Sequence, residues 1–152
     1  MAQSLAKVYL HIVFSTKNRI GFLQDKNLQK EIHAYLAGIC KNLDSPSHLI
    51  GGTTDHIHIL CLLSRKYTIS DLLRELKRES SKWIKTKNIL SLNDFHWQNG
   101  YGAFSVAPSH VDPLKKYIAN QEEHHRKETF QDEFRRLLQK YNVEYDERYI
   151  WD

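Results

Sequence analysis

Residues 55–63 read DHIHILCLL, an apolar run that contains two histidines. Isoleucine, leucine and cysteine fill its other positions after the first, so an extended chain here would be apolar on both faces. Strands of this kind are typical of the centre of a sheet. We therefore expect residues 55–63 to form an inner strand.

The patterns on either side of this run predict the remaining elements. Residues 7–16 (KVYLHIVFST) are rich in β-branched and aromatic residues, as in a strand. Residues 25–43 carry apolar side chains at helical spacing and begin with Asp25, a favourable helix cap. In chain order, the predicted elements are a strand at 7–16, a helix at 25–43, strands at 48–52 and 55–63, a helix from about Ser70 to 87, extended pieces within 93–108, a helix at about 110–127 and a helix at about 129–141.

The order β-α-β-β-α-β is that of the ferredoxin-like fold. We therefore predict an α+β protein, with an antiparallel ferredoxin-like sheet, helices on one face and additional C-terminal helices. Ser70 and Asp112 are the expected caps of the second and third helices, and Pro113 suits the first turn of the third. Neither a repeat nor a Pro- or Ser-rich linker interrupts the chain, so residues 1–152 are expected to form a single domain.

The overall composition suits a folded protein in a reducing compartment. Of the 152 residues, 41% are hydrophobic and 26% charged, which argues against disorder. Cys40 and Cys61 lie in apolar surroundings and are expected to be free, buried thiols in the cytoplasm. The apolar run near the N-terminus contains His11 and is followed by Lys17 and Arg19, which does not fit a signal peptide. No segment approaches the ~20 apolar residues of a membrane helix, so no membrane partner is expected.

His56 and His58 stand two positions apart in the predicted inner strand. Side chains at i and i+2 of a strand point to the same face, with Cα atoms about 7 Å apart. Two imidazoles on one face can serve as two ligands of a metal site, which then needs a third ligand. They can equally be core histidines that each make a hydrogen bond, because burying an unpaired polar group is costly. Asp55 points to the other face of a regular strand but can still orient a ligand.

A candidate third ligand lies in the predicted third helix. Tyr117 and Gln121 stand at i and i+4 on one helical face, and His124 and His125 follow one turn later. A glutamine oxygen can complete a site begun by two imidazoles. A tyrosine phenol has a pKa of about 10 and needs help, for example from a divalent cation, to act as a nucleophile. Alternatively, Tyr117 covers the core and Gln121 faces solvent.

Together the two features resemble the HUH-type single-strand endonucleases with one catalytic tyrosine. More closely, the chain is similar to the small single-tyrosine transposases of the IS200/IS605 type. The matching residues are the H-hydrophobic-H of HIH at 56–58 and the Y-x-x-x-Q of YIANQ at 117–121. Each motif is weak alone, but their order, spacing and whole-chain context make the combination specific. A histidine-triad hydrolase would need H-x-H-x-H, and the third position here is Leu60.

The resemblance implies a role for each of these residues. His56, His58 and Gln121 would hold one divalent metal, Mg²⁺ or Mn²⁺, of which Mn²⁺ better suits two nitrogen ligands. Tyr117 would attack the scissile phosphate and leave a 5′-phosphotyrosine link and a free 3′-hydroxyl. The link keeps the phosphodiester energy, so rejoining needs no nucleotide cofactor. Such enzymes recognise hairpins in single-stranded DNA at element ends. They act as homodimers in which the tyrosine helix of one subunit completes the metal site of the other.

Basic residues supply a candidate DNA-binding surface in a chain with a net charge of +4. Those of the second helix recur at steps of three or four and would form a stripe: Arg74, Lys77, Arg78, Lys82 and Lys85. Lys17 and Arg19, after the first strand, are further candidates for phosphate contact. The stripe can equally be an ordinary solvated helix face. Aromatic residues that suit base stacking, core packing or a dimer interface are Trp83, Trp97, Tyr101 and Phe104.

A second hypothesis for the function comes from a different class of protein. A catalytically silent, domesticated relative with a ferredoxin-like fold would bind nucleic-acid hairpins but never form a covalent product. The sequence contains the same motifs under both hypotheses, so the two are separated by the chemistry of Tyr117 and not by pattern.

Overall fold

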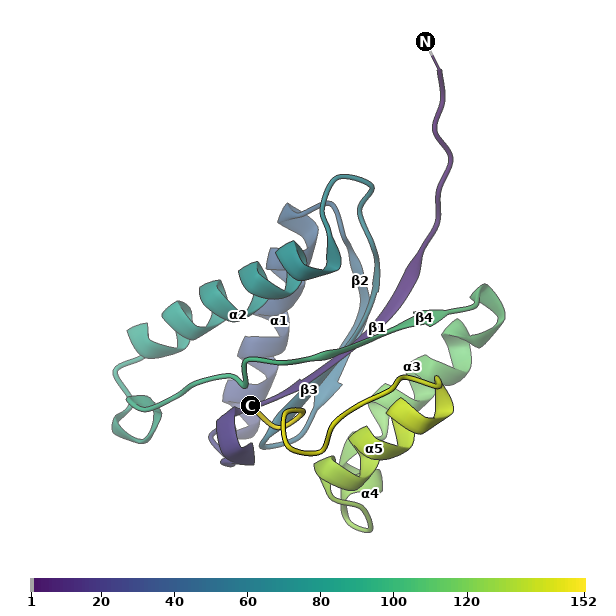
Figure 1. The fold of residues 1–152 in the computed structure, drawn as a ribbon. Coiled ribbons are helices and arrows are strands. Elements are labelled where there is room, and N and C mark those ends of the chain that lie inside the picture. The colour runs from purple at the N-terminus through teal and green to yellow at the C-terminus, as the bar shows by residue number, and fades with distance from the viewer. Residues whose placement is uncertain (1) are drawn as a thin grey trace.

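The computed structural model describes residues 2–152, which form a four-stranded antiparallel sheet with helices on both sides (Figure 1). The strands are β1 (Tyr9–Ser15), β2 (Ser47–Gly52), β3 (His56–Leu62) and β4 (Gly102–Val106), in the order β2-β3-β1-β4. β3 lies between β2 and β1, so the prediction of an inner strand at residues 55–63 is confirmed. The strand order and the succession of elements are those of the predicted ferredoxin-like α+β fold.

The alternation of side chains along β1 and β3 divides the sheet into two faces. In the antiparallel register, Ile12 pairs with Ile59 and Val13 pairs with His58. The first face carries Leu10, Ile12, Phe14, Ile57, Ile59 and Cys61, all of which belong to the main apolar core. The second face carries Tyr9, His11, Val13, His56, His58 and Leu60.

Two long helices, α1 (Lys26–Asn42) and α2 (Ile69–Thr86), cover the first face and enclose the main core. α1 begins as predicted, with the Asp25 carboxylate accepting from the Asn27 N–H at 2.8 Å. α2 begins earlier than predicted, because Thr68 and not Ser70 is its N-cap. The Thr68 hydroxyl accepts from the Asp71 N–H, and the Asp71 carboxylate accepts from the Thr68 N–H, which forms a capping box.

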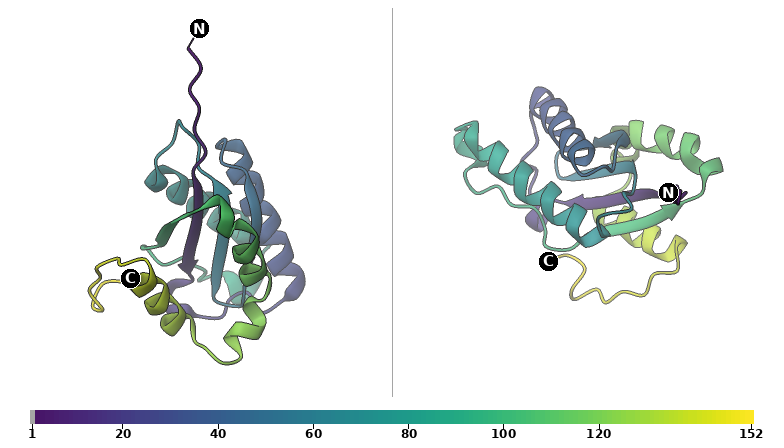
Figure 2. Two further views of the ribbon diagram at one scale, coloured as in Figure 1. Left: turned by 90° about the vertical axis from the view of Figure 1, so that its right-hand side faces the viewer. Right: turned by 90° about the horizontal axis from the view of Figure 1, so that it is seen from above.

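Three shorter helices follow β4, namely α3 (Val111–Ala119), α4 (Gln121–His125) and α5 (Phe130–Lys140). α3 and α5 pack on the second face, opposite α1 and α2 (Figure 2). Gly51 of β2 allows α3 to approach closely, since a Cβ there would lie 2.7 Å from the Ile118 carbonyl oxygen. The additional C-terminal helices therefore give the sheet a second covered side.

The helix predicted at about 110–127 is in fact two helices, α3 and α4, which separate at Asn120. Asn120 has φ −100° and ψ 22°, outside the α-helical range, and asparagine favours such positions at helix ends. Asp112 is not the cap, because His110 occupies that position and Asp112 lies with Pro113 in the first turn. The helix predicted at about 129–141 corresponds to α5, whose N-cap is Thr129.

The remaining segments are short. Single 3₁₀ turns occupy Lys17–Arg19, Leu90–Leu92 and Pro108–His110. The extended pieces predicted within 93–108 are β4 and an isolated bridge between Thr16 and Trp97. Cys40 and Cys61 are free and buried, as predicted. Among the helices of residues 2–152, none combines the length and the apolar character that a membrane crossing requires.

Candidate active site

A cluster of buried histidines occupies the second face of the sheet. His56 and His58 of β3 are fully buried, and their ring centroids lie 5.2 Å apart. His11 of the neighbouring β1 joins them, with its Nε2 2.8 Å from the Nδ1 of His58. The two β3 histidines therefore share one face, as their spacing predicts.

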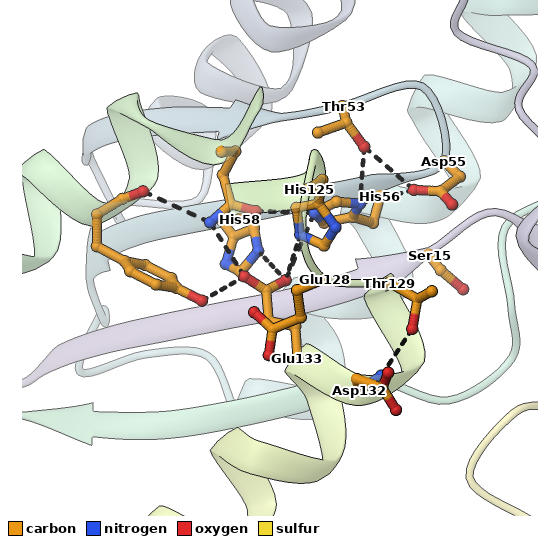
Figure 3. Close-up of polar contacts among 12 residues, drawn as sticks. Ser15, Thr53, Asp55, His56, His58, His125, Glu128, Thr129, Asp132 and Glu133 are labelled. Atoms are coloured by element: carbon orange, nitrogen blue, oxygen red, sulfur yellow. Dashed lines mark hydrogen bonds and ion pairs between the residues drawn. The ribbon is translucent and has the colours of Figure 1, made fainter. Parts of the chain in front are cut away.

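Asp55 and Thr53 orient the imidazole of His56. The Nδ1 atom of His56 lies 2.7 Å from Oδ1 of Asp55 and 3.0 Å from the Thr53 hydroxyl (Figure 3). Burial would raise the pKa of Asp55, but its hydrogen bonds with His56 and Thr53 outweigh this and hold that pKa below its usual value. A carboxylate on Nδ1 fixes the tautomer and directs Nε2 toward the site interior. Asp55 comes directly before the first residue of β3, so the alternation of side chains within the strand does not apply to it, and its carboxylate can reach His56.

Burial keeps the imidazoles of His58 and His11 neutral. Desolvation lowers the pKa of His58, and it lowers that of His11 further still. The second nitrogen of His58, Nε2, lies 3.0 Å from Oε1 of Glu133. Neutral imidazole is the form that binds metal ions, so His58 is suited to this role.

Glu133 of α5 is a buried carboxylate at the centre of the cluster, and the sequence analysis did not identify it. Its Oε1 lies 3.0 Å from Nε2 of His58, 3.0 Å from Nε2 of His125 and 3.5 Å from Nε2 of His56. Figure 3 shows the carboxylate pointing from α5 toward His58 and His125. Burial opposes its ionisation, but hydrogen bonds from His125 and His58 hold the pKa of Glu133 far below its usual range.

The other carboxylate oxygen of Glu133 contacts the predicted nucleophile and the predicted third ligand. The Tyr117 hydroxyl donates to Oε2, and the Gln121 side chain donates to the same atom at 3.1 Å. Gln121 also places its own Oε1 2.9 Å from Nε2 of His56. Gln121 therefore contacts His56 directly, and the ring of Tyr117 lies beside His58 with centroids 5.8 Å apart, although the two residues lie on separate helices.

The Tyr117 phenol is protonated in this arrangement. Its pKa is raised above the usual value by burial and by the negative charge of Glu133. Arg136 of α5 opposes this shift, with Nη2 donating to the phenol oxygen at 2.9 Å. The imidazole of His124 packs against the phenol ring, with centroids 4.7 Å apart.

His125 of α4 is a further histidine on the cluster. Its side chain is 12% exposed, and its Nε2 donates to Glu133 at 3.0 Å. The hydrogen bond to Glu133 and the charges of Glu133 and Asp55 outweigh desolvation and raise the pKa of His125. No motif in the sequence specifies a role for His125, and in the structure it contacts the buried carboxylate.

The residues of the HIH and YIANQ motifs thus lie close together around the buried carboxylate of Glu133. The family model described as "Transposase IS200 like" matches residues 4–121, most of the chain. The chain belongs to this family of transposases. The matched region ends at Gln121, so His125 and Glu133 lie beyond it.

Two solved structures share the fold of this transposase. A protein from Deinococcus radiodurans R1 assigned as a transposase is 19% identical, with a TM-score of 0.63 over 80% of this chain and 95% of that chain. A REP-associated tyrosine transposase bound to a REP hairpin is 14% identical, with a TM-score of 0.60 over 82% of this chain and 73% of that chain. A comparison with curated proteins found no match at a significant level.

Three side chains of this cluster form a group that could hold a metal ion. One ligand atom each from His56, His125 and Glu133 lie within 4.8 Å of one another. His58 and Gln121 point into the same space. Several imidazole nitrogens with carboxylate and amide oxygens suit Mn²⁺ better than Mg²⁺, which prefers oxygen ligands alone.

A sequence signal for Glu133 exists but is faint. Residues Phe130, Phe134, Leu137 and Leu138 form the buried stripe of α5, and Glu133 stands among them at helical spacing. A carboxylate inside an apolar stripe must find partners when it is buried. This rule indicates that Glu133 has polar partners but does not say which ones.

The predicted basic stripe of α2 lies over the first face of the sheet, away from Tyr117. Within the stripe, Arg74, Arg78 and Lys82 each pair with an acidic residue of the same helix. Lys77 donates to the carbonyl oxygens of residues 98, 99 and 100 at 2.9, 3.1 and 2.6 Å, and burial lowers its pKa to about 8. Lys85 is exposed. Lys77 is therefore engaged in holding a loop.

Lys17 and Arg19 lie closer to the site. They follow β1, where the Thr16 N–H donates to the Asp55 carbonyl oxygen at 2.8 Å. A cavity of about 730 Å³ opens beside the site, and its lining includes Arg19, Asp55 and His125. Arg19 also donates to the carbonyl of Trp151 at 3.0 Å.

The four aromatic residues that the sequence suggested for base stacking, core packing or a dimer interface differ in their exposure to solvent. Trp97 and Phe104 are buried, and Trp97 donates its indole N–H to Ser80 at 2.9 Å. Trp83 stacks on Tyr35 with centroids 4.9 Å apart. Tyr101 is 39% exposed. Of these four aromatic residues, Tyr101 alone presents a large accessible surface for stacking.

Proposed function

We propose that this transposase cleaves and rejoins single-stranded DNA at the ends of an insertion element, with Tyr117 as the nucleophile. The observation that carries the proposal is the convergence of Tyr117 and Gln121 on the buried pair His56 and His58. These four residues come from two motifs that are far apart in the chain but lie close together in the fold. His56 and Gln121, which are in contact, are 65 positions apart. Core packing alone requires no such meeting of a phenol, an amide and two imidazoles.

In this proposal, His56, His58 and Gln121 hold one divalent metal through Nε2, Nε2 and Oε1. The bound metal would polarise the scissile phosphate and fix it for attack. Asp55 keeps Nε2 of His56 available, and burial keeps the imidazole of His58 neutral. Two imidazole nitrogens and one amide oxygen, the ligands that the sequence also predicts, suit Mn²⁺ better than Mg²⁺.

Tyr117 attacks the phosphorus in line with the leaving 3′ oxygen. The phenol gives up its proton as its oxygen bonds to phosphorus, the bond from phosphorus to the 3′ oxygen breaks, and the released oxygen takes up a proton to become the free 3′-hydroxyl, so that a 5′-phosphotyrosine link remains. The Arg136 guanidinium, 2.9 Å from the phenol oxygen, stabilises negative charge that develops there. The reverse reaction with another 3′-hydroxyl rejoins the strand without a nucleotide cofactor.

Single-stranded DNA with hairpins is the proposed partner. The relative bound to a REP hairpin supports hairpin binding by this fold. A cavity of about 440 Å³ lies beside Tyr117, and its lining includes Arg136, Lys140 and His110. A cavity of this size, with two cationic residues in a lining that is otherwise largely apolar and aromatic, suits a nucleotide that flanks the scissile phosphate. Lys17, Arg19 and the exposed cations of α2 remain proposed contacts for more distant phosphates.

The decisive experiment detects the covalent intermediate. Labelled single strands that carry the hairpin DNA flanking the gene are incubated with protein and Mn²⁺, then separated on a denaturing gel. The wild type should give a shifted, protease-sensitive band, and Tyr117→Phe should bind the DNA without giving that band. An adduct formed by Tyr117→Phe would overturn the assignment of the nucleophile. A hairpin-binding protein that forms no adduct with any metal would be the catalytically silent relative.

The proposed homodimer raises the question of which chain supplies the tyrosine. One chain here brings Tyr117 to its own histidines, and the segment at 107–110 between β4 and α3 is where a chain would cross in an exchanged dimer. Co-expressing the variants Tyr117→Phe and His58→Ala tests this arrangement. Restored adduct formation would show that Tyr117 acts on the partner's histidines, whereas two inactive variants that stay inactive together would show action within one chain.

A further inference from the structure

We propose that Glu133 is an anionic ligand of the same metal that the histidine pair would hold. The inference rests on the metal site of the proposed function and extends it with a residue from α5. It assigns to this transposase a site of histidine nitrogens, an amide oxygen and one carboxylate oxygen, and transition metals such as Mn²⁺ are the ions that such a site takes.

The distances around Oε1 of Glu133 carry the argument. This atom lies 3.0 Å from Nε2 of His58 and 3.5 Å from Nε2 of His56. Two ligands bound to one metal at about 2.1 Å in tetrahedral geometry are themselves about 3.4 Å apart. Each of these two separations is therefore in the range expected for two ligands of one ion, and His56, His125 and Glu133 each place one ligand atom within 4.8 Å of the others. His125 places a further nitrogen 3.0 Å from the same oxygen.

Each proposed ligand is hydrogen-bonded through the atom that points away from the site. Its other nitrogen or oxygen is therefore directed at the position of the metal. His56 is held through Nδ1 by Asp55, and His58 is held through Nδ1 by His11, so both Nε2 atoms face Glu133. The carboxylate is held through Oε2 by Gln121, which leaves Oε1 facing the imidazoles. Such contacts on the outer atoms are what orient metal ligands in proteins.

Charge supports the same assignment. His56, His58 and Gln121 are neutral donors, so in the absence of DNA these three ligands alone give a buried divalent cation no directly bound negative charge, and Asp55 lies behind His56. Glu133 is fully buried, and its carboxylate contacts both histidines, where it can supply that charge directly to the metal. The family match ends at Gln121, so the carboxylate comes from a helix outside the matched region.

The same contacts permit an opposite arrangement, in which Glu133 occupies the position of the metal and blocks it. The two arrangements predict effects of opposite sign. Removing a ligand weakens metal binding, whereas removing a plug strengthens it. The geometry favours the ligand, because Gln121 and Tyr117 fix the carboxylate in place through its other oxygen.

The test is a Mn²⁺ titration of the protein without DNA, with free Mn²⁺ measured by electron paramagnetic resonance. Glu133→Gln should weaken binding by about tenfold or more. The matched control is Asp132→Asn, which removes the neighbouring charge on the exposed side of α5 and should leave binding unchanged. Binding by Glu133→Gln that equals or exceeds the wild type would overturn the assignment.

A second measurement needs no variant and covers the case in which Glu133→Gln does not fold. Hydrogen exchange of the α5 amides is compared in the wild type with and without Mn²⁺. A ligand on α5 predicts slower exchange in α5 with the metal, and a displaced plug predicts faster exchange. A wild type that binds no Mn²⁺ would overturn the metal site as a whole. Adduct formation by Tyr117 is measured separately with DNA, so its failure would leave the Mn²⁺ result standing.

Discussion

The phenol of Tyr117 donates its hydrogen bond to the buried carboxylate of Glu133, 16 positions later in the chain. The contact joins α3 to α5 directly over the histidine pair. It ties the proposed nucleophile to the most negative group of the site, so the ionisation of the phenol depends on a helix that lies outside the matched family region.

Replacing Glu133 by glutamine should lower the pKa of Tyr117. The pKa of this phenol is raised by burial and by the Glu133 charge, and the substitution removes the second cause. The phenolate of the variant should therefore form at lower pH than that of the wild type. Ultraviolet absorbance of the phenolate measures this in metal-free protein, and subtracting the titration of Tyr117→Phe isolates one tyrosine among the 8. An unchanged or higher pKa in the variant would contradict the electrostatic explanation.

Arg136→Gln should slow formation of the DNA adduct. The guanidinium donates to the phenol oxygen, and its loss leaves the developing charge less stabilised. We expect a rate about a hundredfold lower at saturating DNA. Arg135→Gln is the control, because Arg135 pairs with Asp132 and Glu147 on the surface. Equal rates for the two variants would show that Arg136 has no role at the phenol.

Asp55→Asn should weaken Mn²⁺ binding although Asp55 is not itself expected to be a ligand. The carboxylate 2.7 Å from Nδ1 of His56 favours the tautomer whose Nε2 carries a lone pair for a metal. Loss of such a partner weakens metal affinity by about 10- to 100-fold. The exposed Asp44, which pairs with Lys66, offers the control Asp44→Asn. If both variants bind Mn²⁺ as the wild type does, Asp55 does not orient the histidine.

Lys77→Met should lower the free energy of unfolding, and its effect on the free energy of DNA binding should be smaller. The Lys77 ammonium donates to three backbone carbonyls in the loop before β4, and methionine keeps the apolar stem but not the donors. We expect the free energy of unfolding to fall by about 1–3 kcal/mol. Lys85→Met, on the exposed side of the same helix, should change it by about 0.5 kcal/mol or less. Chemical denaturation of both variants checks the difference.

Much of the fold followed from local pattern. The apolar run at residues 55–63 predicted an inner strand, and Asp25 marked the start of α1, because alternation and capping depend on neighbouring residues. Local rules were weaker where two residues could fill one role. Thr68 and Ser70 are both good caps, and the capping box with Asp71 decided for Thr68. Nothing in the helical period of residues 110–127 indicated that the chain would leave the helix at Asn120.

The sequence by itself determined that His56 and His58 share a face and that Tyr117 and Gln121 lie about one turn apart. The first follows from the alternation of side chains within β3, and the second from a separation of only four residues, although α3 ends and α4 begins between them. Only the tertiary structure decided that Glu133 and Asp55 hold these residues. α5 reaches the histidines because Phe130 and Phe134 pack against Val13 on the second face, and this packing brings Glu133 over β3. Contacts between helices and strands far apart in the chain depend on how whole faces fit together, and no spacing within one element encodes that fit.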